Sequence, residues 1–449
     1  MKEGILMHEY RTNRAFRTIT NVQIIDSLGS GLYSIVFLIY AATLPFKTLA
    51  VSVASIAWII PALANIFTGY LADQTKHKRH AMWIAYLVQT VLFLIIAAMI
   101  GRSTKVSVFF IIMTLDIIAR LLGDYGNGLS IPIMKHIVTP EHMNDATSVG
   151  TAIDSLIQII AAALGATLIV ALHHQYDLFA LLDALTFLVA GVMFFLARHQ
   201  YDQAEIEIHE SVAQAKSARA QTTEKETEGF ASSFKLAMQE FSQNPFLLFM
   251  IIAGLGVNLL GTALDPLSNL VFLHMHNLWF VNYGYTIALV NIVFSVGSIA
   301  GAILANDIFK NTSMVALLSS TMVIMVLVVV DMLTLQNLWL LLICFFAEAY
   351  LLGKVNPRFN AVLINTVPDD HLAATGGVLS TVMMIGAPVG QFVFLTLANV
   401  VSIPVSLSVL GICSLIVAIL ILARGAGRLT KNDPTTANYA TAHVQTTEN

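Results

Sequence analysis

Three ionisable residues stand four apart within one long apolar stretch of the sequence. Asp116, Arg120 and Asp124 interrupt a run that is otherwise apolar over 106–132. In a helix this spacing places all three side chains on one face, within an arc of about 80°. Desolvation favours the neutral form of a carboxyl group, whereas a neighbouring guanidinium favours the charged form. An acid in that balance could take up and release a proton, so proton coupling is one interpretation and a neutralised structural ion pair is the other.

Three further acids interrupt other apolar stretches, namely Asp26, Asp154 and Glu348. Asp26 and Asp154 lie at about the same depth from the end of their stretches as Asp124 does. If these acids face a common cavity, they form an acidic cluster around Arg120. An ordinary packing role is the alternative for Asp154, and Glu348 is the candidate coupling residue of the second half of the chain.

Four other charged residues in apolar stretches receive a structural interpretation. Asp183 and Asp265 stand toward the outer ends of their stretches. Lys354 and Arg358 stand nearer the cytoplasmic end, where long basic side chains can extend to the membrane surface.

Several chemistries are disfavoured by motifs that the sequence lacks. It contains neither H-E-x-x-H nor G-x-S-x-G, and it has no Gly-rich loop followed by Lys-Ser/Thr. The two cysteines, Cys344 and Cys413, are far apart, and the 13 histidines fall in loops, tails or span edges. We therefore expect no enzyme, no metal and no cofactor. The net charge of −4 gives no reason to expect nucleic acid as a partner.

The composition requires lipid as the main solvent. The chain is 57% hydrophobic and 11% charged, where soluble domains carry about 25% charged residues. A helix that crosses a bilayer needs about 20 mostly apolar residues. Twelve candidate spans follow, at 19–44, 48–72, 81–101, 106–132, 146–172, 177–198, 246–272, 283–306, 313–335, 338–362, 373–399 and 403–423. The fold class is an all-α membrane protein of twelve transmembrane helices.

Lysine and arginine determine the expected orientation. With the N-terminus inside, the outer loops hold only Lys47, Arg102 and Lys105, and most of the other basic residues fall on the cytoplasmic side. This asymmetry predicts that both termini are cytoplasmic. The expected parts are a six-helix bundle at 1–198, a polar cytoplasmic loop at 199–244, a second six-helix bundle at 245–424 and a polar tail at 425–449.

Two short sequence echoes relate these halves. TPEHMNDAT at 139–147 resembles VPDDHLAAT at 367–375, and Gly69-x-Leu71-Ala72-Asp73 resembles the stretch from Gly301 to Asp307. Both echoes fall on predicted cytoplasmic loops at equivalent places, which favours duplication. Two similar bundles can rock about a site at their interface, as in many secondary transporters.

The loop GYLADQTKHKR at 69–79 carries a resemblance to the major facilitator superfamily. Gly69, Asp73, Lys78 and Arg79 fit the pattern of that family between spans two and three, whereas Gln74 and Lys76 depart from it. The chain looks most like twelve-span drug exporters of the macrolide-efflux and siderophore-export type, through QIIDSLGSGL at 23–32, LLDALTF at 181–187 and VPDDHLAATGG at 367–377. The usual proline of the exporter motif in span five is absent. Physically, a carboxylate beside basic groups at the membrane edge could act as a conformational latch. The other interpretation is that the basic residues only hold this loop on the cytoplasmic side of the membrane.

These observations predict a secondary active transporter of the plasma membrane, acting as a monomer by alternating access. The expected partners are a small-molecule substrate, protons and the lipid bilayer. The favoured function is proton-coupled efflux of amphipathic, drug-like compounds. An uptake permease of the same fold for a sugar, peptide or organic ion is the alternative, and a membrane-embedded enzyme or a sensor is less favoured.

Overall fold

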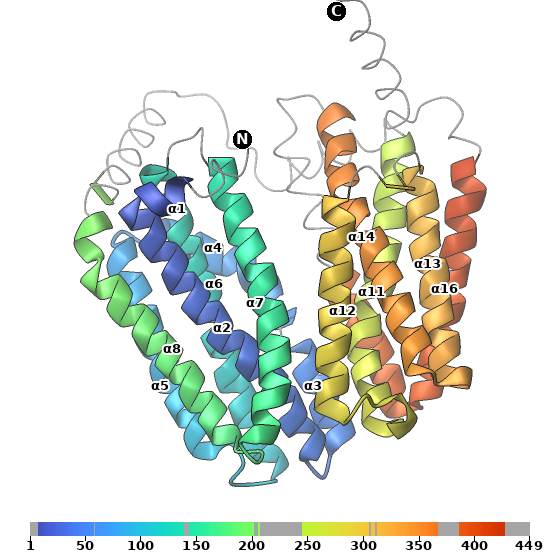
Figure 1. Cartoon of the computed structure of the whole chain (residues 1–449), viewed down its shortest axis with the longest axis horizontal. Helices are drawn as coiled ribbons and strands as arrows, with labels where there is room; N and C mark the ends of the chain where they lie inside the picture. Colours follow the sequence, from blue (N-terminus) through green and yellow to red (C-terminus); the bar gives the residue numbers. More distant parts are fainter. Residues whose placement is uncertain are drawn as a thin grey trace, which may run out of the picture. The chain divides into compact units, whose positions relative to one another are not determined.

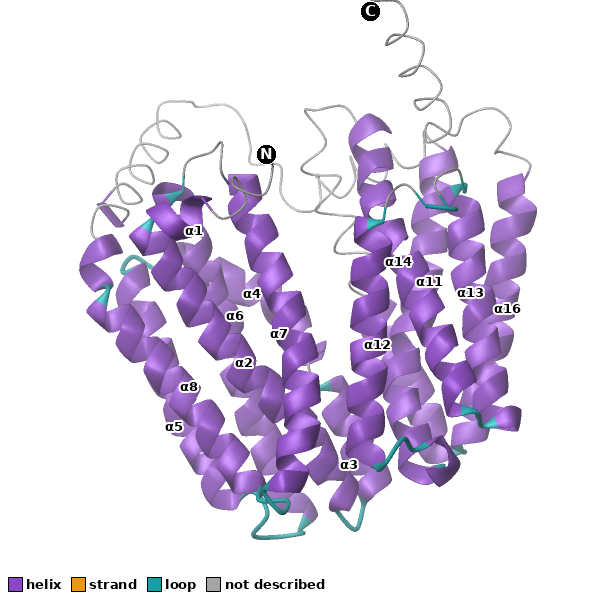
Figure 2. Ribbon diagram, viewed as in Figure 1, coloured by secondary structure: helices purple, strands orange, loops and turns teal. Residues whose placement is uncertain are grey.

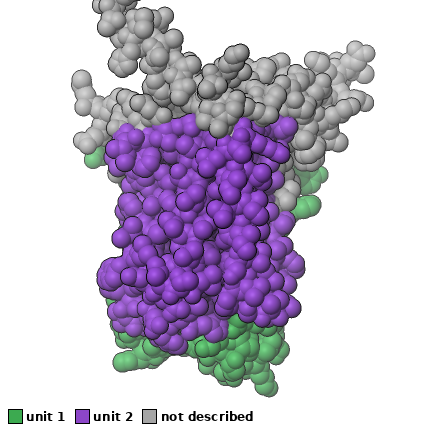
Figure 3. Space-filling view, turned by 90° about the vertical axis from the view of Figure 1, so that its right-hand side faces the viewer, with its two compact units in different colours: residues 1–225 green, residues 226–449 purple. Residues whose placement is uncertain are grey.

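All regular structure in the described residues is helical, which confirms the all-α class (Figures 1 and 2). The computed structural model describes residues 8–57, 59–138, 143–201, 205–206, 245–304, 307–309, 312–366 and 386–426. The chain divides into two compact units, residues 1–225 and 226–449, which Figure 3 colours separately.

The first unit contains eight α-helices and a short 3-10 turn in its described residues. They are α1 (His8–Thr12), α2 (Arg14–Thr43), α3 (Lys47–Ile56), α4 (Ile59–Gln74), α5 (Lys78–Met99), α6 (Val106–Ile137), α7 (Met143–Ala171), α8 (Tyr176–Leu196) and η2 (Arg198–Tyr201). Helix α2 packs against α7 and α8, α5 packs against α6 and α8, and α4 packs against α6.

The second unit repeats this helical character in its described residues. Its elements are α11 (Pro245–His274), η3 (His276–Leu278), α12 (Tyr283–Ile303), α13 (Met314–Val330), the π-helical η4 (Asp331–Leu335), α14 (Leu338–Thr366), a helix at Gly386–Val400 and α16 (Ile403–Ala426). Helix α12 packs along α14, and α13 packs against both α14 and α16.

Every predicted span contains an apolar helix. Ten helical stretches are long and apolar enough in their described residues to cross a membrane, where Lys47–Asn65, which covers α3 and the start of α4, counts as one. Two shorter apolar helices lie at Leu156–Ala171 and Gly386–Val400. These two fall within the predicted spans at 146–172 and 373–399. The chain is therefore a multi-pass membrane protein.

One predicted span is divided into two helices. The expected helix at 48–72 is α3 followed by α4, and Pro61 stands in the first turn of α4. Because proline has no N–H, Pro61 cannot donate to the carbonyl of Ala57 four residues earlier. At the end of α3 the N–H of Ala57 closes a tighter turn by donating to the carbonyl of Ala54 at 3.4 Å.

A second proline has the opposite outcome. Pro266 stands inside α11, which continues through it to His274. The missing N–H of Pro266 leaves the carbonyl of Thr262 without its helical donor. The side chain of Gln391, on the helix Gly386–Val400, donates to that carbonyl at 2.9 Å. This bond satisfies the carbonyl and joins two helices of the second unit.

Glycines allow α12 and α14 to approach closely. A Cβ atom added to Gly301 would overlap the carbonyl group of Tyr350, and one added to Gly353 would overlap the carbonyl oxygen of Ser298. A Cβ on Gly297 would lie 2.7 Å from the carbonyl oxygen of Phe346. Gly297 and Gly301 thus allow close packing of these two helices.

Candidate functional site

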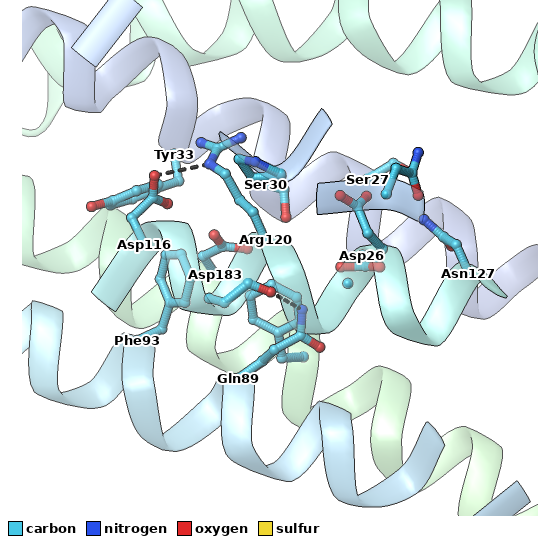
Figure 4. Close-up of a pocket in the computed structure, with 16 residues that line it drawn as sticks. Asp26, Ser27, Ser30, Tyr33, Gln89, Phe93, Asp116, Arg120, Asn127 and Asp183 are labelled. Carbon is cyan, nitrogen blue, oxygen red and sulfur yellow. Dashed lines mark hydrogen bonds and ion pairs between the residues drawn. The ribbon is translucent and has the colours of Figure 1, made fainter. Parts of the chain in front are cut away.

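Five helices of the first unit, α2, α4, α5, α6 and α8, surround a cavity of about 350 Å³ (Figure 4). Four carboxyl groups line it, those of Asp26, Asp116, Asp124 and Asp183, together with the guanidinium of Arg120. We call it the acidic cavity. Its neutral polar lining includes Ser27, Ser30, Asn65, Gln89 and Asn127.

Arg120 is held by an ion pair on its own helix. Its Nε donates to Oδ2 of Asp116 at 2.8 Å, and its Nη2 donates to the hydroxyl of Ser34 on α2 at 3.0 Å. Asp116 is 1% exposed, and its Oδ1 has no hydrogen-bond partner among the described residues. The pair therefore leaves one carboxylate oxygen buried without a partner, a state that costs free energy unless a proton or water satisfies it.

The structure brings Asp26 and Asp124 to the same cavity as this pair. Asp124 forms no ion pair with Arg120 within the described part of the chain, although both stand on α6. Helical side chains tilt toward the N-terminus of their helix, so an arginine reaches the acid four residues before it more readily than the acid four residues after it. Asp124 therefore lines the cavity without a direct ion pair to Arg120.

Sequence reasoning missed the fourth acid of this cavity. Asp183 was interpreted as structural, but it is completely buried and lines the cavity from α8. Its Oδ1 accepts a hydrogen bond from the hydroxyl of Thr186 at 3.2 Å, and its Oδ2 has no partner among the described residues. The sequence feature that could have indicated a cavity acid is the single acidic residue in the apolar stretch LLDALTF, a stretch that served above only as part of a family resemblance.

Asp154 lies outside the lining of the acidic cavity. It stands on α7, is exposed, and accepts a hydrogen bond of 3.5 Å from the hydroxyl of Ser27. The predicted cluster around Arg120 thus contains Asp26 and Asp124, gains Asp183, and touches Asp154 only through Ser27.

Glu348 lines a different cavity, of about 260 Å³, in the second unit. Helices α11, α12 and α14 surround this cavity, and Asp265 of α11 also lines it. Glu348 is 2% exposed, and its Oε2 has no hydrogen-bond partner among the described residues. Like Asp183, Asp265 was expected to be structural and instead faces a cavity.

The basic residues of the 69–79 loop bind within their own unit. The buried Lys78 donates from Nζ to the carbonyl of Ala72 at 2.6 Å, at the end of α4, where a positive charge also complements the helix dipole. Arg79 donates to the carbonyl of Arg198 at 3.0 Å and lies 3.5 Å from a carboxylate oxygen of Glu205.

Gly69 and Asp73 are the other two residues of the expected latch. Gly69 lies on α4, where an added Cβ would meet nothing within 4 Å. The close approach of α4 to α6 is instead at Gly128, whose added Cβ would lie 2.9 Å from Cβ of Ala72. The side chain of Asp73 lies outside the described residues.

A related arrangement follows α12 in the second unit. Lys354 of α14 lies 3.1 Å from Oδ2 of Asp307, donates to the carbonyl of Leu304, and is 4% exposed. Arg358 donates to the carbonyl of Thr312 at 2.6 Å and to that of Phe309 at 2.8 Å. Backbone carbonyls at the end of α12 and in the following loop bind both side chains, and the expectation that they extend to the membrane surface stays a prediction.

Asp307 lies in the loop after α12. Partial burial raises the pKa of the Asp307 carboxyl, but hydrogen bonds from Tyr350 and Lys354 outweigh this effect and leave its pKa below the usual value. Asp307 is therefore charged at neutral pH and pairs with Lys354.

Comparisons with known proteins agree on the class of fold. The family model of the Major Facilitator Superfamily matches residues 20–391. Among curated proteins, no sequence matches this chain significantly. A mutant of the peptide transporter POT in complex with alafosfalin is similar in structure, with a TM-score of 0.66 at 12% identity, over 94% of this chain and 96% of that chain.

Two other solved structures show the same likeness. The POT family transporter PepTSo has a TM-score of 0.65 at 11% identity, over 94% of this chain and 99% of that chain. A bacterial homolog of the human lysosomal transporter Spinster, in an inward-facing and occupied conformation, has a TM-score of 0.62 at 11% identity, over 92% and 96%. At these identities the likeness concerns the fold.

Proposed function

The chain belongs to the major facilitator superfamily and is a membrane transporter, and we propose that it exports amphipathic, drug-like small molecules in exchange for protons. The acidic cavity carries this proposal. It holds four carboxyl groups and, among its described lining residues, the one basic group of Arg120. Because Asp116 already pairs with that group, the cavity has more acids than it can neutralise internally.

Buried acids of this kind suit proton exchange. A carboxyl group in the membrane is costly when charged, so it takes a proton or a cation unless water reaches it. When a transporter opens to alternate sides, the same group meets two different solutions and can load and release a proton. We assign this coupling role to Asp26, Asp116, Asp124 and Asp183, with Arg120 as the fixed counter-charge.

The remaining candidates have secondary roles in the proposal. Asp154 influences Asp26 from the neighbouring helix through Ser27, and Glu348 belongs to substrate handling in the second unit. Gly69, Asp73, Lys78 and Arg79 form a latch that slows or permits conformational change. The protein acts as a monomer in the plasma membrane.

An uptake permease is the second candidate. The similarity to transporters named for peptides favours it, because these share the fold over nearly the whole chain. A zwitterionic peptide, however, needs a cationic group for its carboxylate. In the acidic cavity the guanidinium of Arg120 is already bound to Asp116, which favours neutral or cationic compounds over zwitterionic peptides as substrates.

Proton movement on addition of compounds tests the proposal. The purified chain in liposomes with a trapped pH indicator should move protons when members of a panel of amphipathic drugs are added. The response should exceed that of empty liposomes, in which a weak base can move protons by passive diffusion alone. Proton movement that occurs only with peptides or sugars would instead support the uptake permease.

The latch has a separate test. Asp73→Asn, or neutralisation of Lys78 and Arg79, should slow transport more than it weakens substrate binding, because this loop lies at the end of α4 and not among the cavity's lining residues. If binding collapses while turnover of bound substrate is unchanged, the latch role is wrong.

A further inference from the structure

The cavity in the second unit differs in chemistry from the acidic cavity. Its described lining is mostly apolar and includes three phenylalanines, Phe272, Phe294 and Phe345. Two carboxyl groups, Asp265 and Glu348, also line it, and no Lys, Arg or His does so among the described residues. It is thus an apolar space with acids and no internal counter-charge, which we call the aromatic cavity.

Glu348 gives this cavity an unsatisfied group. The residue is 2% exposed and lines the cavity from α14, and its Oε2 has no hydrogen-bond partner in the described part of the chain. A buried carboxyl group without a partner is costly in either protonation state. A ligand that brings a positive charge to Glu348 would remove that cost.

The walls of the cavity suit the same ligand. An ammonium group is attracted to the face of an aromatic ring within about 6 Å of its centre, and three phenylalanines line this space. The apolar lining accepts the body of such a ligand by the hydrophobic effect. Asn269 and Asn291 add neutral hydrogen-bonding groups for further polar atoms.

We propose that the aromatic cavity binds the cationic end of an amphipathic ligand, an amine or quaternary ammonium on an aromatic or aliphatic body, with Glu348 as its counter-ion. The inference rests on the proposed function and names its substrate class. In this proposal the first unit exchanges protons and the second unit binds the organic cation. A volume of about 260 Å³ accommodates a cationic head with one aromatic ring.

Equilibrium dialysis of the purified full chain with radiolabelled benzyltrimethylammonium tests the proposal. This probe keeps its charge at every pH, so ionisation of the ligand cannot confuse the result. Saturable binding is expected, and Glu348→Gln should weaken it by about tenfold or more, which corresponds to about 1.4 kcal/mol. Neopentylbenzene has the same shape without the charge, and it should not displace the probe.

Asp331→Asn is the matched control. Asp331 is another buried acid of the second unit with one unpartnered oxygen, but it does not line the aromatic cavity. The affinity of the Asp331→Asn protein for the probe should stay within about twofold of that of the parent protein, a difference of under 0.5 kcal/mol. If Glu348→Gln fails to fold, Phe294→Ala decides, because Phe294 is 36% exposed and its removal spares the packed interior.

Absence of saturable binding, unchanged affinity in Glu348→Gln or in Phe294→Ala, or equal competition by neopentylbenzene would each overturn the proposal. These outcomes are distinct from failure of the proposed function. If cation binding is intact but no compound moves protons, proton exchange is wrong and the aromatic cavity stands. If protons move only with uncharged compounds, the cavity assignment is wrong and proton exchange stands.

Discussion

Arg120 forms its ion pair with Asp116, four residues earlier on α6, and this pairing determines which acids of the acidic cavity lack an ion pair. The pair joins Nε to Oδ2 at 2.8 Å, and Ser34 of α2 takes a second donor of the same guanidinium. Asp26, Asp124 and Asp183 then share the cavity without a direct ion pair to that guanidinium among the described residues. If the three are protonated on one side of the membrane and ionised on the other, Arg120 holds the fixed charge against which they titrate.

Replacement of Arg120 should be the least tolerated charge change in this cavity. Arg120→Ala should lower proton-coupled transport by about tenfold or more, because Asp116 loses its counter-charge and a carboxyl group in the membrane is costly when charged. Asp116 would then stay neutral in both orientations and could not exchange a proton. Arg120→Lys should recover part of the rate, since a point charge lacks the planar fork that bonds Asp116 and Ser34 together. Initial rates of compound-induced proton flux in liposomes measure this.

A structural role for the same charges predicts a different pattern. Arg120→Ala would then express poorly and be rescued by Asp116→Asn with Asp124→Asn. A triple variant that folds and transports against a gradient at the parent rate would show that proton coupling does not need these charges. Arg102→Ala, an exposed arginine in the loop before α6, serves as the control and should leave the rate unchanged.

At the scale of single residues, spacing predicted part of the site. Positions four apart on one helix brought Asp116, Arg120 and Asp124 to one cavity, as a helix must. Asp183 was missed because its environment is made by other helices. It packs where Gly29 of α2 lacks a side chain, since a Cβ there would lie 2.5 Å from Oδ1 of Asp183. A single sequence does not reveal which glycine faces which acid.

Two prolines show what hydropathy can and cannot predict about helices. It located an apolar helix in every predicted span. It did not predict that α3 ends at Ile56, shortly before Pro61, while α11 continues through Pro266. The difference at Pro266 is the amide of Gln391, which stands 129 residues after Thr262 in the sequence. Such long-range donors cannot be inferred from local propensity.

The crossing of α12 and α14 should depend on its glycines. Gly301→Ala should destabilise the purified protein by about 1–3 kcal/mol, because the new methyl overlaps the carbonyl group of Tyr350 and backbone cannot move aside easily. The midpoint of thermal unfolding, followed by the reaction of buried Cys344 with a thiol-reactive dye, measures this.

Gly261→Ala provides the matched control on α11. An added Cβ at Gly261 meets nothing within 4 Å, so this change should be neutral or should stabilise the helix by about 0.5–1 kcal/mol. Equal unfolding midpoints for the two variants would contradict the close crossing of α12 and α14.

For the whole molecule, the distribution of basic residues predicts which side faces the cytoplasm. Cysteines placed at the exposed positions Lys76 and His174, in a background where Cys344 and Cys413 are serine, test this prediction. A membrane-impermeant thiol reagent added to intact cells should label the cysteine at 174 and not the one at 76. Equal labelling of both would contradict cytoplasmic termini.

The family and the two-unit architecture follow from the whole chain, whereas substrate and direction depend on a few side chains. The family model covers residues 20–391, and the solved peptide transporters share the fold at 11–13% identity. At such identity the cavity walls are free to differ, so the acids of this chain have to be read residue by residue. Fold was accessible from hydropathy and loop motifs, but the division of acids between two cavities required the packed helices.

Proton-driven export is tested most directly in inside-out vesicles with an imposed pH gradient. The potential is clamped at zero, the lumen is made acidic, and a panel compound without a titratable group is added outside, so passive trapping of a weak base cannot occur. The account predicts that the compound accumulates in the lumen, that collapse of the gradient releases it, and that Arg120→Ala vesicles do not accumulate it. No accumulation with an acidic lumen, together with accumulation when the lumen is made alkaline, would mean that proton and compound travel together and would contradict export by exchange.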